Sequence, residues 1–179
     1  MTSSVGKGLT IPDLAESFLL GVQQHFAAAN VALPARQYVA AGLPANIAWD
    51  CEQLVVALTG IGWGQAEDVV QLSPQINAQA SVAAVRHAVF SVQLVRCTPA
   101  KGPHGALPTV DQIHENGLAF FRDAGLLSQA LVTACTRVAA MLGLQNTGNV
   151  QPGAVEPLGP TGGLVALDAS VAITAGALG

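Results

Sequence analysis

A regular alternation near the C-terminal end of the chain constrains the fold more than any other sequence feature. Between residues 164 and 175, apolar side chains alternate with small or polar ones, and the apolar set is Val165, Leu167, Ala169, Val171 and Ile173. Successive side chains of a β-strand point to opposite faces, so this spacing predicts a strand with one buried face. The rest of the chain must therefore supply further strands and a layer that covers the sheet.

Three other segments are predicted as strands. Residues 37–41 form a short apolar run, and residues 82–97 alternate over a longer stretch. Residues 52–61 are rich in β-branched side chains on both faces, and we expect both faces to be buried or half-buried. The segment 145–163, rich in Gly, Asn and Pro, is expected to lead into the last strand without forming an element of its own.

The first amphipathic helix is predicted from Pro12 to Asn30. Thr10 precedes Asp13 by three residues, which is the spacing of a capping box at a helix N-terminus. The residues expected to face the core recur every fourth position and are Leu14, Phe18, Val22 and Phe26.

A second helix is predicted to begin after Thr109 and to stop at Gly143, with a bend near Gly117 or Gly125. Thr109 and Gln112 repeat the capping-box spacing. We expect its buried stripe to run through Ile113, Phe120 or Phe121, Leu127, Leu131, Ala134, Val138 and Met141.

The order of these elements predicts an α+β fold, with a mainly antiparallel sheet of about four strands flanked by two helices. We expect residues 1–179 to form a single domain, with an N-terminal helix region at 1–35 and the sheet and second helix at 36–174. Long loops are predicted at 62–80 and 98–108, where Gly and Pro recur without a clear period.

Charge is scarce in this chain. Seven Lys and Arg stand against eleven Asp and Glu, which gives a net charge of −4 in 179 residues. There is no cationic field to hold a nucleic-acid backbone, so strong DNA or RNA binding is not expected. No stretch is expected to span a membrane, and no export signal is recognised at the N-terminus.

The cysteines and histidines do not suggest a reactive centre. Cys51, Cys97 and Cys135 are odd in number and far apart, so we expect small buried thiols in a reducing compartment and neither a disulfide framework nor a zinc site. No metal-ligand spacing links the four histidines, which are His25, His87, His104 and His114.

Three weaker patterns are interpreted in structural terms. His114 lies with Asp111 and Glu115 in a polar cluster that is typical of a solvated first helical turn. The sequence Gly159–Gly163 precedes a strand, whereas a phosphate-binding loop opens a helix, so it is predicted to be a turn. The rings expected to anchor packing, in preference to stacking on bases, are Trp49, Trp63 and Tyr38.

No catalytic, cofactor-binding or metal-binding residue is predicted, and the chain is not expected to be an enzyme. A small hydrolase built on Cys51 or on the His114 cluster remains the alternative, and it requires a catalytic pair within hydrogen-bond reach. With 18 charged residues and long apolar strands, a lone subunit would expose large apolar patches. The composition therefore favours a permanently assembled structural subunit.

Several segments resemble neck and tail proteins of long-tailed actinobacteriophages, above all tail terminators. The resemblance spans most of residues 36–174, and the string from Trp49 to Leu54, Trp-Asp-Cys-Glu-Gln-Leu, is its most specific part. The other matching segments are Arg36-Gln-Tyr-Val-Ala-Ala-Gly, Phe90-Ser-Val-Gln-Leu-Val-Arg-Cys and Gly159-Pro-Thr-Gly-Gly-Leu.

This resemblance implies a non-enzymatic virion protein, assembled in the host cytoplasm, that forms a homohexameric ring. Such a ring terminates the tail tube and joins the tail to the head. Its implied partners are the tail tube protein and a head-to-tail connector or stopper protein, while DNA passes through the lumen without specific binding. No cofactor and no membrane are implied.

Two alternatives share this resemblance. One is a head-to-tail connector or stopper ring that binds the portal side, and the other is a bacterial adaptor domain with the phage fold. In any ring, the loops at 62–80 and 98–108 are candidate contacts. The charged residues expected to form pairs between subunits are Arg86, Arg96 and Asp168.

Overall fold

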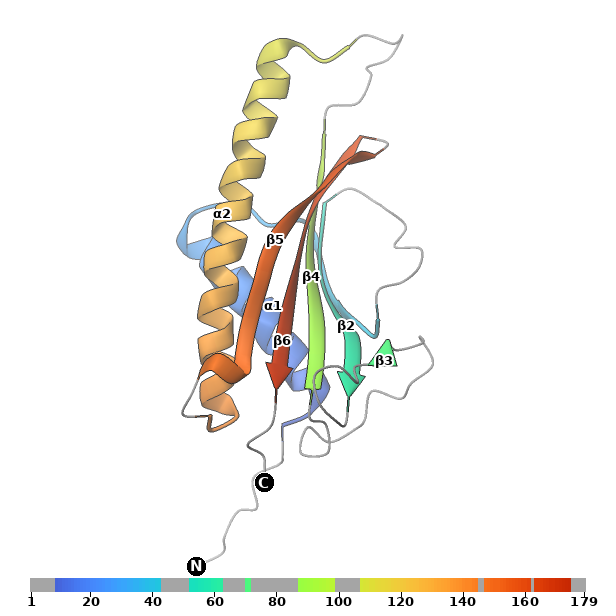
Figure 1. Ribbon diagram of the computed structural model, residues 1–179. Coiled ribbons are helices and arrows are strands. Elements are labelled where there is room, and N and C mark those ends of the chain that lie inside the picture. Colours follow the sequence, from blue (N-terminus) through green and yellow to red (C-terminus); the bar gives the residue numbers. More distant parts are fainter. Residues whose placement is uncertain are drawn as a thin grey trace, which may run out of the picture.

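Two helices cover one face of a mixed, mostly antiparallel sheet (Figure 1). The computed structural model describes residues 9–42, 52–62, 70–71, 87–98, 107–144, 147–161 and 163–174. In chain order the elements are α1 (Ile11–Ala28), β1 (Arg36–Ala40), β2 (Gln53–Gly62), β3 (Val70–Gln71), β4 (His87–Cys97), α2 (Val110–Met141), the 3-10 turn η4 (Thr147–Asn149), β5 (Val150–Thr161) and β6 (Leu164–Thr174).

The strands lie in the order β1-β2-β4-β6-β5, and β3 pairs with β2 beside this path. β1 runs parallel to β2, and every other neighbouring pair is antiparallel. The predicted α+β class is confirmed, with five strands in the main path where about four were expected.

The strand predictions are confirmed for β1, β2 and β6, and for the part of the third predicted strand that the structure describes as β4. Both faces of β2 are buried, with only Thr59 partly exposed. β3 falls within the segment 62–80 that was predicted as a loop, so that prediction is wrong for these two residues.

β5 was not predicted, because its prolines and glycines are typical of irregular segments. The structure places this strand at one edge of the sheet, where one side of its backbone needs no partner. Proline lacks the backbone N–H that a central strand would donate to its neighbour. It is tolerated at an edge because no neighbouring strand needs that hydrogen bond. The register with β6 shifts between Pro152 and Val155 and again between Leu158 and Thr161, which accommodates the irregular sequence.

α1 begins and packs as predicted. The Thr10 backbone N–H donates to Asp13 Oδ2 at 2.7 Å, and the Asp13 N–H donates to Thr10 Oγ1 at 3.4 Å. The predicted stripe of Leu14, Phe18, Val22 and Phe26 is buried along its whole length. The ring of Phe18 packs against that of Phe90 on β4, with centroids 5.3 Å apart, which anchors the helix on the sheet.

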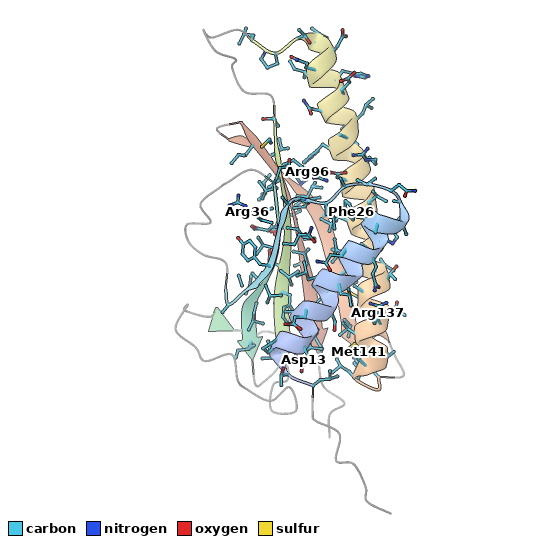
Figure 2. All side chains as sticks on the ribbon, turned by 180° about the vertical axis from the view of Figure 1, so that it is seen from behind. Asp13, Phe26, Arg36, Arg96, Arg137 and Met141 are labelled. Atoms are coloured by element: carbon cyan, nitrogen blue, oxygen red, sulfur yellow. The ribbon has the colours of Figure 1, made fainter. Side chains whose placement is uncertain are left out.

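α2 has the predicted ends, and its predicted stripe is buried at Leu127, Leu131, Ala134 and Val138. The Thr109–Gln112 capping box is present, and the helix runs without a break to Met141, before Gly143 in the left-handed region. Its buried residues all lie between Asp123 and Ala139. The expectation that Ile113 and Met141 are buried is wrong. The N-terminal half of α2 extends past the end of α1, as Figures 1 and 2 show.

By length and composition, α2 is apolar enough to cross a membrane, contrary to the expectation that no segment would qualify. The core helix of a globular domain meets the same criterion. The C-terminal half of α2 packs against α1 and β5, as a core helix does.

The two helices are antiparallel and very close. The Ser17 hydroxyl, near the start of α1, contacts Met141 Sδ at the end of α2, at 3.6 Å. Figure 2 shows Asp13 and Met141 at the same end of the pair. At the crossing, a Cβ placed on Gly21 would lie 2.7 Å from the Cβ of Ala134. Gly21 is therefore required by the approach of α2.

Replacing Gly21 by alanine is expected to destabilise the protein by about 1–3 kcal/mol, because the added methyl group overpacks the helix crossing. Gly125→Ala is the matched control, since a Cβ there meets nothing within 4 Å. That change should stabilise the protein by about 0.5–1 kcal/mol through helix propensity. Urea unfolding of both variants measures the difference, and a neutral or stabilising Gly21→Ala would contradict the close crossing.

Candidate functional site

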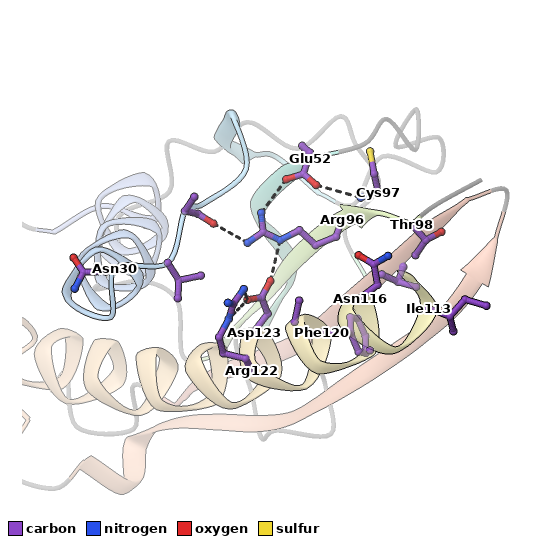
Figure 3. Close-up of a pocket in the computed structure, with 15 residues that line it drawn as sticks. Asn30, Glu52, Arg96, Cys97, Thr98, Ile113, Asn116, Phe120, Arg122 and Asp123 are labelled. Carbon is purple, nitrogen blue, oxygen red and sulfur yellow. Dashed lines mark hydrogen bonds and ion pairs between the residues drawn. The ribbon is translucent and has the colours of Figure 1, made fainter. Parts of the chain in front are cut away.

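An ion-pair network joins four segments of the chain where α2 leaves the core (Figure 3). Arg96, near the end of β4, donates through Nε to Asp123 Oδ2 at 2.9 Å and through Nη1 to Glu52 Oε2 at 2.9 Å. Its Nη2 donates to the backbone oxygen of Ala32, after α1, at 2.8 Å. The planar guanidinium offers donors in fixed directions, so one side chain can hold three neighbours in place.

Asp123 is the most constrained member of this network. Its side chain is 3% exposed, in the middle of a largely apolar helix. A buried carboxylate is stable only where hydrogen bonds and an opposite charge replace water. One oxygen of Asp123 is paired with Arg96, and the other accepts from Arg122 at 3.3 Å. The pairing thus accounts for a charge on the buried side of α2.

Glu52 connects the network to the sheet through an unusual backbone conformation. Its φ of 60° lies in the left-handed region, which a non-glycine residue seldom adopts. The Glu52 carboxylate accepts from Arg96 and also from the backbone N–H of Cys97 at 3.2 Å. Its own carbonyl accepts from the Arg36 N–H at 3.4 Å. These contacts hold the strained residue at the junction of β1, β2 and β4.

A pocket of about 710 Å³ lies beside the network. One part of the lining is the side of α2 that carries Ile113, Asn116 and Phe120, and Val31 and Val165 also line the pocket. Arg96, Glu52, Asp123 and Arg122 contribute charged groups to the same lining, as Figure 3 shows.

The lining of this pocket offers no arrangement for catalysis. Among the described residues that line it there is no histidine or serine, and the only hydroxyl belongs to Thr98. Within the described ranges, no three His, Cys, Asp or Glu side chains are grouped so that they could hold a metal ion. The chemistry available here is ion pairing and apolar contact.

The residues predicted to pair between subunits have different positions. Arg86 lies outside the described residues. Arg96 is occupied within its own chain by the network above, and Asp168 on β6 accepts a hydrogen bond from Ser91 Oγ at 2.6 Å. Pairing across a subunit boundary stays a prediction for all three. Sequence reasoning missed Asp123, although an acidic residue four positions before the buried Leu127 is a signal of a buried partner.

The cysteine prediction is wrong for Cys97 and confirmed for Cys135. Cys97 is exposed at the end of β4 and is disulfide-bonded, with its partner outside the described residues. Cys97 is the last residue of β4, and the apolar neighbour that suggested burial, Val95, lies inside the strand before it. Cys135 is a free, buried thiol on α2. The inference of a reducing compartment, which rested on free thiols, therefore loses its basis.

The remaining candidates do not form a centre. His114, Asp111 and Glu115 are all exposed on the first turns of α2, in agreement with the solvated-turn interpretation. His87 and Cys97 lie at opposite ends of β4. The Tyr38 hydroxyl is 3.3 Å from Gln53 Oε1, at the edge of the sheet. The candidates that lie outside the described residues are Cys51, His104, Trp49 and Trp63.

Exposed apolar side chains gather along the N-terminal half of α2. None of residues 110–122 is buried. Its apolar side chains, with their exposed fractions, are Val110 (81%), Ile113 (59%), Leu118 (57%) and Phe121 (75%), and Leu107 just before the helix is 74% exposed. Apolar side chains gathered in this way mark contact surfaces in soluble proteins.

Comparison with known proteins does not identify a family. No protein-family model matches the chain, and no curated protein matches it. The class of protein therefore has to be argued from the fold, from the network and from this exposed surface.

Replacing Asp123 by alanine is expected to cost about 3–5 kcal/mol of stability, because Arg96 then loses its buried partner. Arg122→Ala is the control. Its side chain is 54% exposed, and the loss of its contact to the same carboxylate should cost about 0–1 kcal/mol. Replacing both Arg96 and Asp123 by leucine should recover part of the loss. Equal losses for Arg122→Ala and Asp123→Ala in urea unfolding would refute this ranking.

Burial raises the pKa of Cys135 from 9.0 to about 12. The thiol of the folded protein thus stays protonated at pH 8, and reaction with a thiol reagent should be at least tenfold slower than in the urea-unfolded protein. Because the unfolded state loses this proton first, stability should also fall as the pH rises from 9 towards 12. Rapid labelling of the folded protein at pH 8 would show that Cys135 is accessible.

Proposed function

We propose that this protein is a structural subunit of a phage virion, a tail terminator that forms a homohexameric ring at the end of the tail tube. The observation that carries the proposal is the uncovered apolar half of α2, in a chain with only 18 charged residues. A surface of this kind is stable in water when another protein covers it. The sequence resemblance described above supplies the particular assembly.

The two edges of the sheet are suited to different neighbours. β5 carries Pro152 and Pro157, which prevent another strand from pairing along its outer edge. β1 is a short strand without proline, and its side chains are partly or fully exposed. Neighbours in a closed ring meet through unlike surfaces, so each subunit needs two different faces. An asymmetric pair of edges meets this requirement.

The charge distribution suits a channel through which DNA passes without being held. Glu156 on β5 and Asp168 on β6 are directly paired across the strands, which is an unfavourable arrangement for the isolated sheet. Two carboxylates at one position repel a phosphate backbone. In the proposed ring, such a surface would let DNA slide into the host cell, and neither a cofactor nor a membrane is required.

The same features are compatible with a head-to-tail connector or stopper ring that binds the portal side. The two functions differ only in the partner. The tail terminator binds the tail tube protein and a connector or stopper protein, whereas the connector binds the portal complex. In both cases the protein belongs to the virion and is assembled in the host cytoplasm.

Light scattering and negative-stain imaging test the proposal. Purified protein is examined alone, with assembled tail tubes and with portal complexes from an actinobacteriophage. We expect rings of about six subunits or density at one end of each tube. Binding to portal complexes alone would assign the connector role in its place. A protein that stays monomeric and binds neither structure would overturn the proposal.

A further inference from the structure

The N-terminal half of α2 has two sides. One side carries Ile113, Asn116 and Phe120 and faces the pocket. The other faces solvent and carries Val110, Leu118 and Phe121, which the helical repeat of 3.6 residues places on one side. A single helix of this length is marginal in water, so the outer side needs a partner to stabilise it.

The charges beside the outer side identify the partner. Asp111 and Glu115 lie near the start of the helix. Arg122 lies on the same flank, at the end of the N-terminal half. A second copy crossing in the antiparallel direction brings Arg122 of each chain close to Asp111 and Glu115 of the other. In a parallel two-fold pair the same flanks lie on opposite sides of the contact, so these opposite charges do not meet. The centre of the antiparallel arrangement falls close to Leu118, midway between the opposite charges.

We propose that the N-terminal half of α2 is an antiparallel dimerisation surface for a second copy of this chain, with the two-fold axis close to Leu118. Phe121 and Val110 of each copy cover the outer side of the other. Arg122 is available for this contact because its side chain is half exposed and its bond to Asp123 is long, at 3.3 Å. An anionic lipid surface is a poorer partner, because Asp111 and Glu115 flank the apolar side chains.

This surface goes beyond the proposed ring. A two-fold contact joins identical surfaces, whereas neighbours in a ring meet through unlike ones. The antiparallel contact would therefore link two free subunits, or two rings, and it does not depend on the ring being formed.

Charge exchange tests the proposal by light scattering over a concentration series. Arg122→Glu should weaken dimerisation about tenfold, because it sets acidic side chains against each other twice in the symmetric dimer. Combining it with Asp111→Arg and Glu115→Arg should restore dimerisation. Phe121→Ser should also weaken it at least tenfold. Val132→Ser is the matched control, since Val132 is an exposed apolar residue farther along α2, and it should have no effect.

Cross-linking gives a readout that does not depend on affinity. Under mild oxidation, Leu118→Cys should form a disulfide-linked dimer, whereas Val132→Cys should not. Leu118, Phe121 and Val132 are exposed, so circular dichroism and the melting temperature of their variants should stay close to those of the parent. Arg122→Glu also loses the contact to Asp123, so its melting temperature is compared with that of Arg122→Ala.

Three results would overturn the proposal. The first is a monomer at every concentration without cross-linking at position 118, and the second is binding to lipid vesicles through Phe121 without self-association. The third is self-association that Phe121→Ser and Arg122→Glu leave unchanged. That last result would place the contact elsewhere and leave the proposed ring intact.

Discussion

The buried ion pair between Arg96 and Asp123 is the interaction on which the form of this molecule depends. Asp123 is the first buried residue of α2, and no residue of the helix before it is buried. The pair therefore marks the position where α2 changes from a core helix to a projecting one. Since Arg96 also holds Glu52 and the carbonyl of Ala32, the same guanidinium sets the positions of β2 and of the segment after α1. A charge buried in this way demands one geometry, which an apolar contact would not.

The core and the projecting half follow opposite rules. In the part of α2 that follows Asp123, the two helices are so close that Gly21 has no room for a side chain. Phe18 and Phe90 fill the space between α1 and the sheet. In the part of α2 that precedes Asp123, the apolar side chains of Val110, Ile113, Leu118 and Phe121 are exposed. Because the chain has few charged residues, apolar side chains make up much of its surface. We therefore expect this surface to associate with other protein.

Much of the fold was predictable because it depends on local spacing. The alternation in β6, the fourfold spacing in α1 and both capping boxes are properties of neighbouring residues. β5 was missed because proline and glycine are excluded only from the middle of a sheet, and the sequence does not reveal which strand lies at an edge. The disulfide at Cys97 was missed for a related reason, since cysteines far apart in the chain meet only when the fold brings them together.

By itself, the sequence determined the class of the fold, the ends of its helices, the stripe of α1 that faces the core and the scarcity of charge. Only the tertiary structure decided that the first turns of α2 extend beyond the sheet, because periodicity shows which side of a helix is apolar but not whether anything covers it. The tertiary structure also decided that Arg96, Glu52 and Asp123 meet, since these residues come from elements far apart in the chain. Local patterns reflect interactions over a few residues, whereas burial and ion pairing depend on the packing of the whole chain.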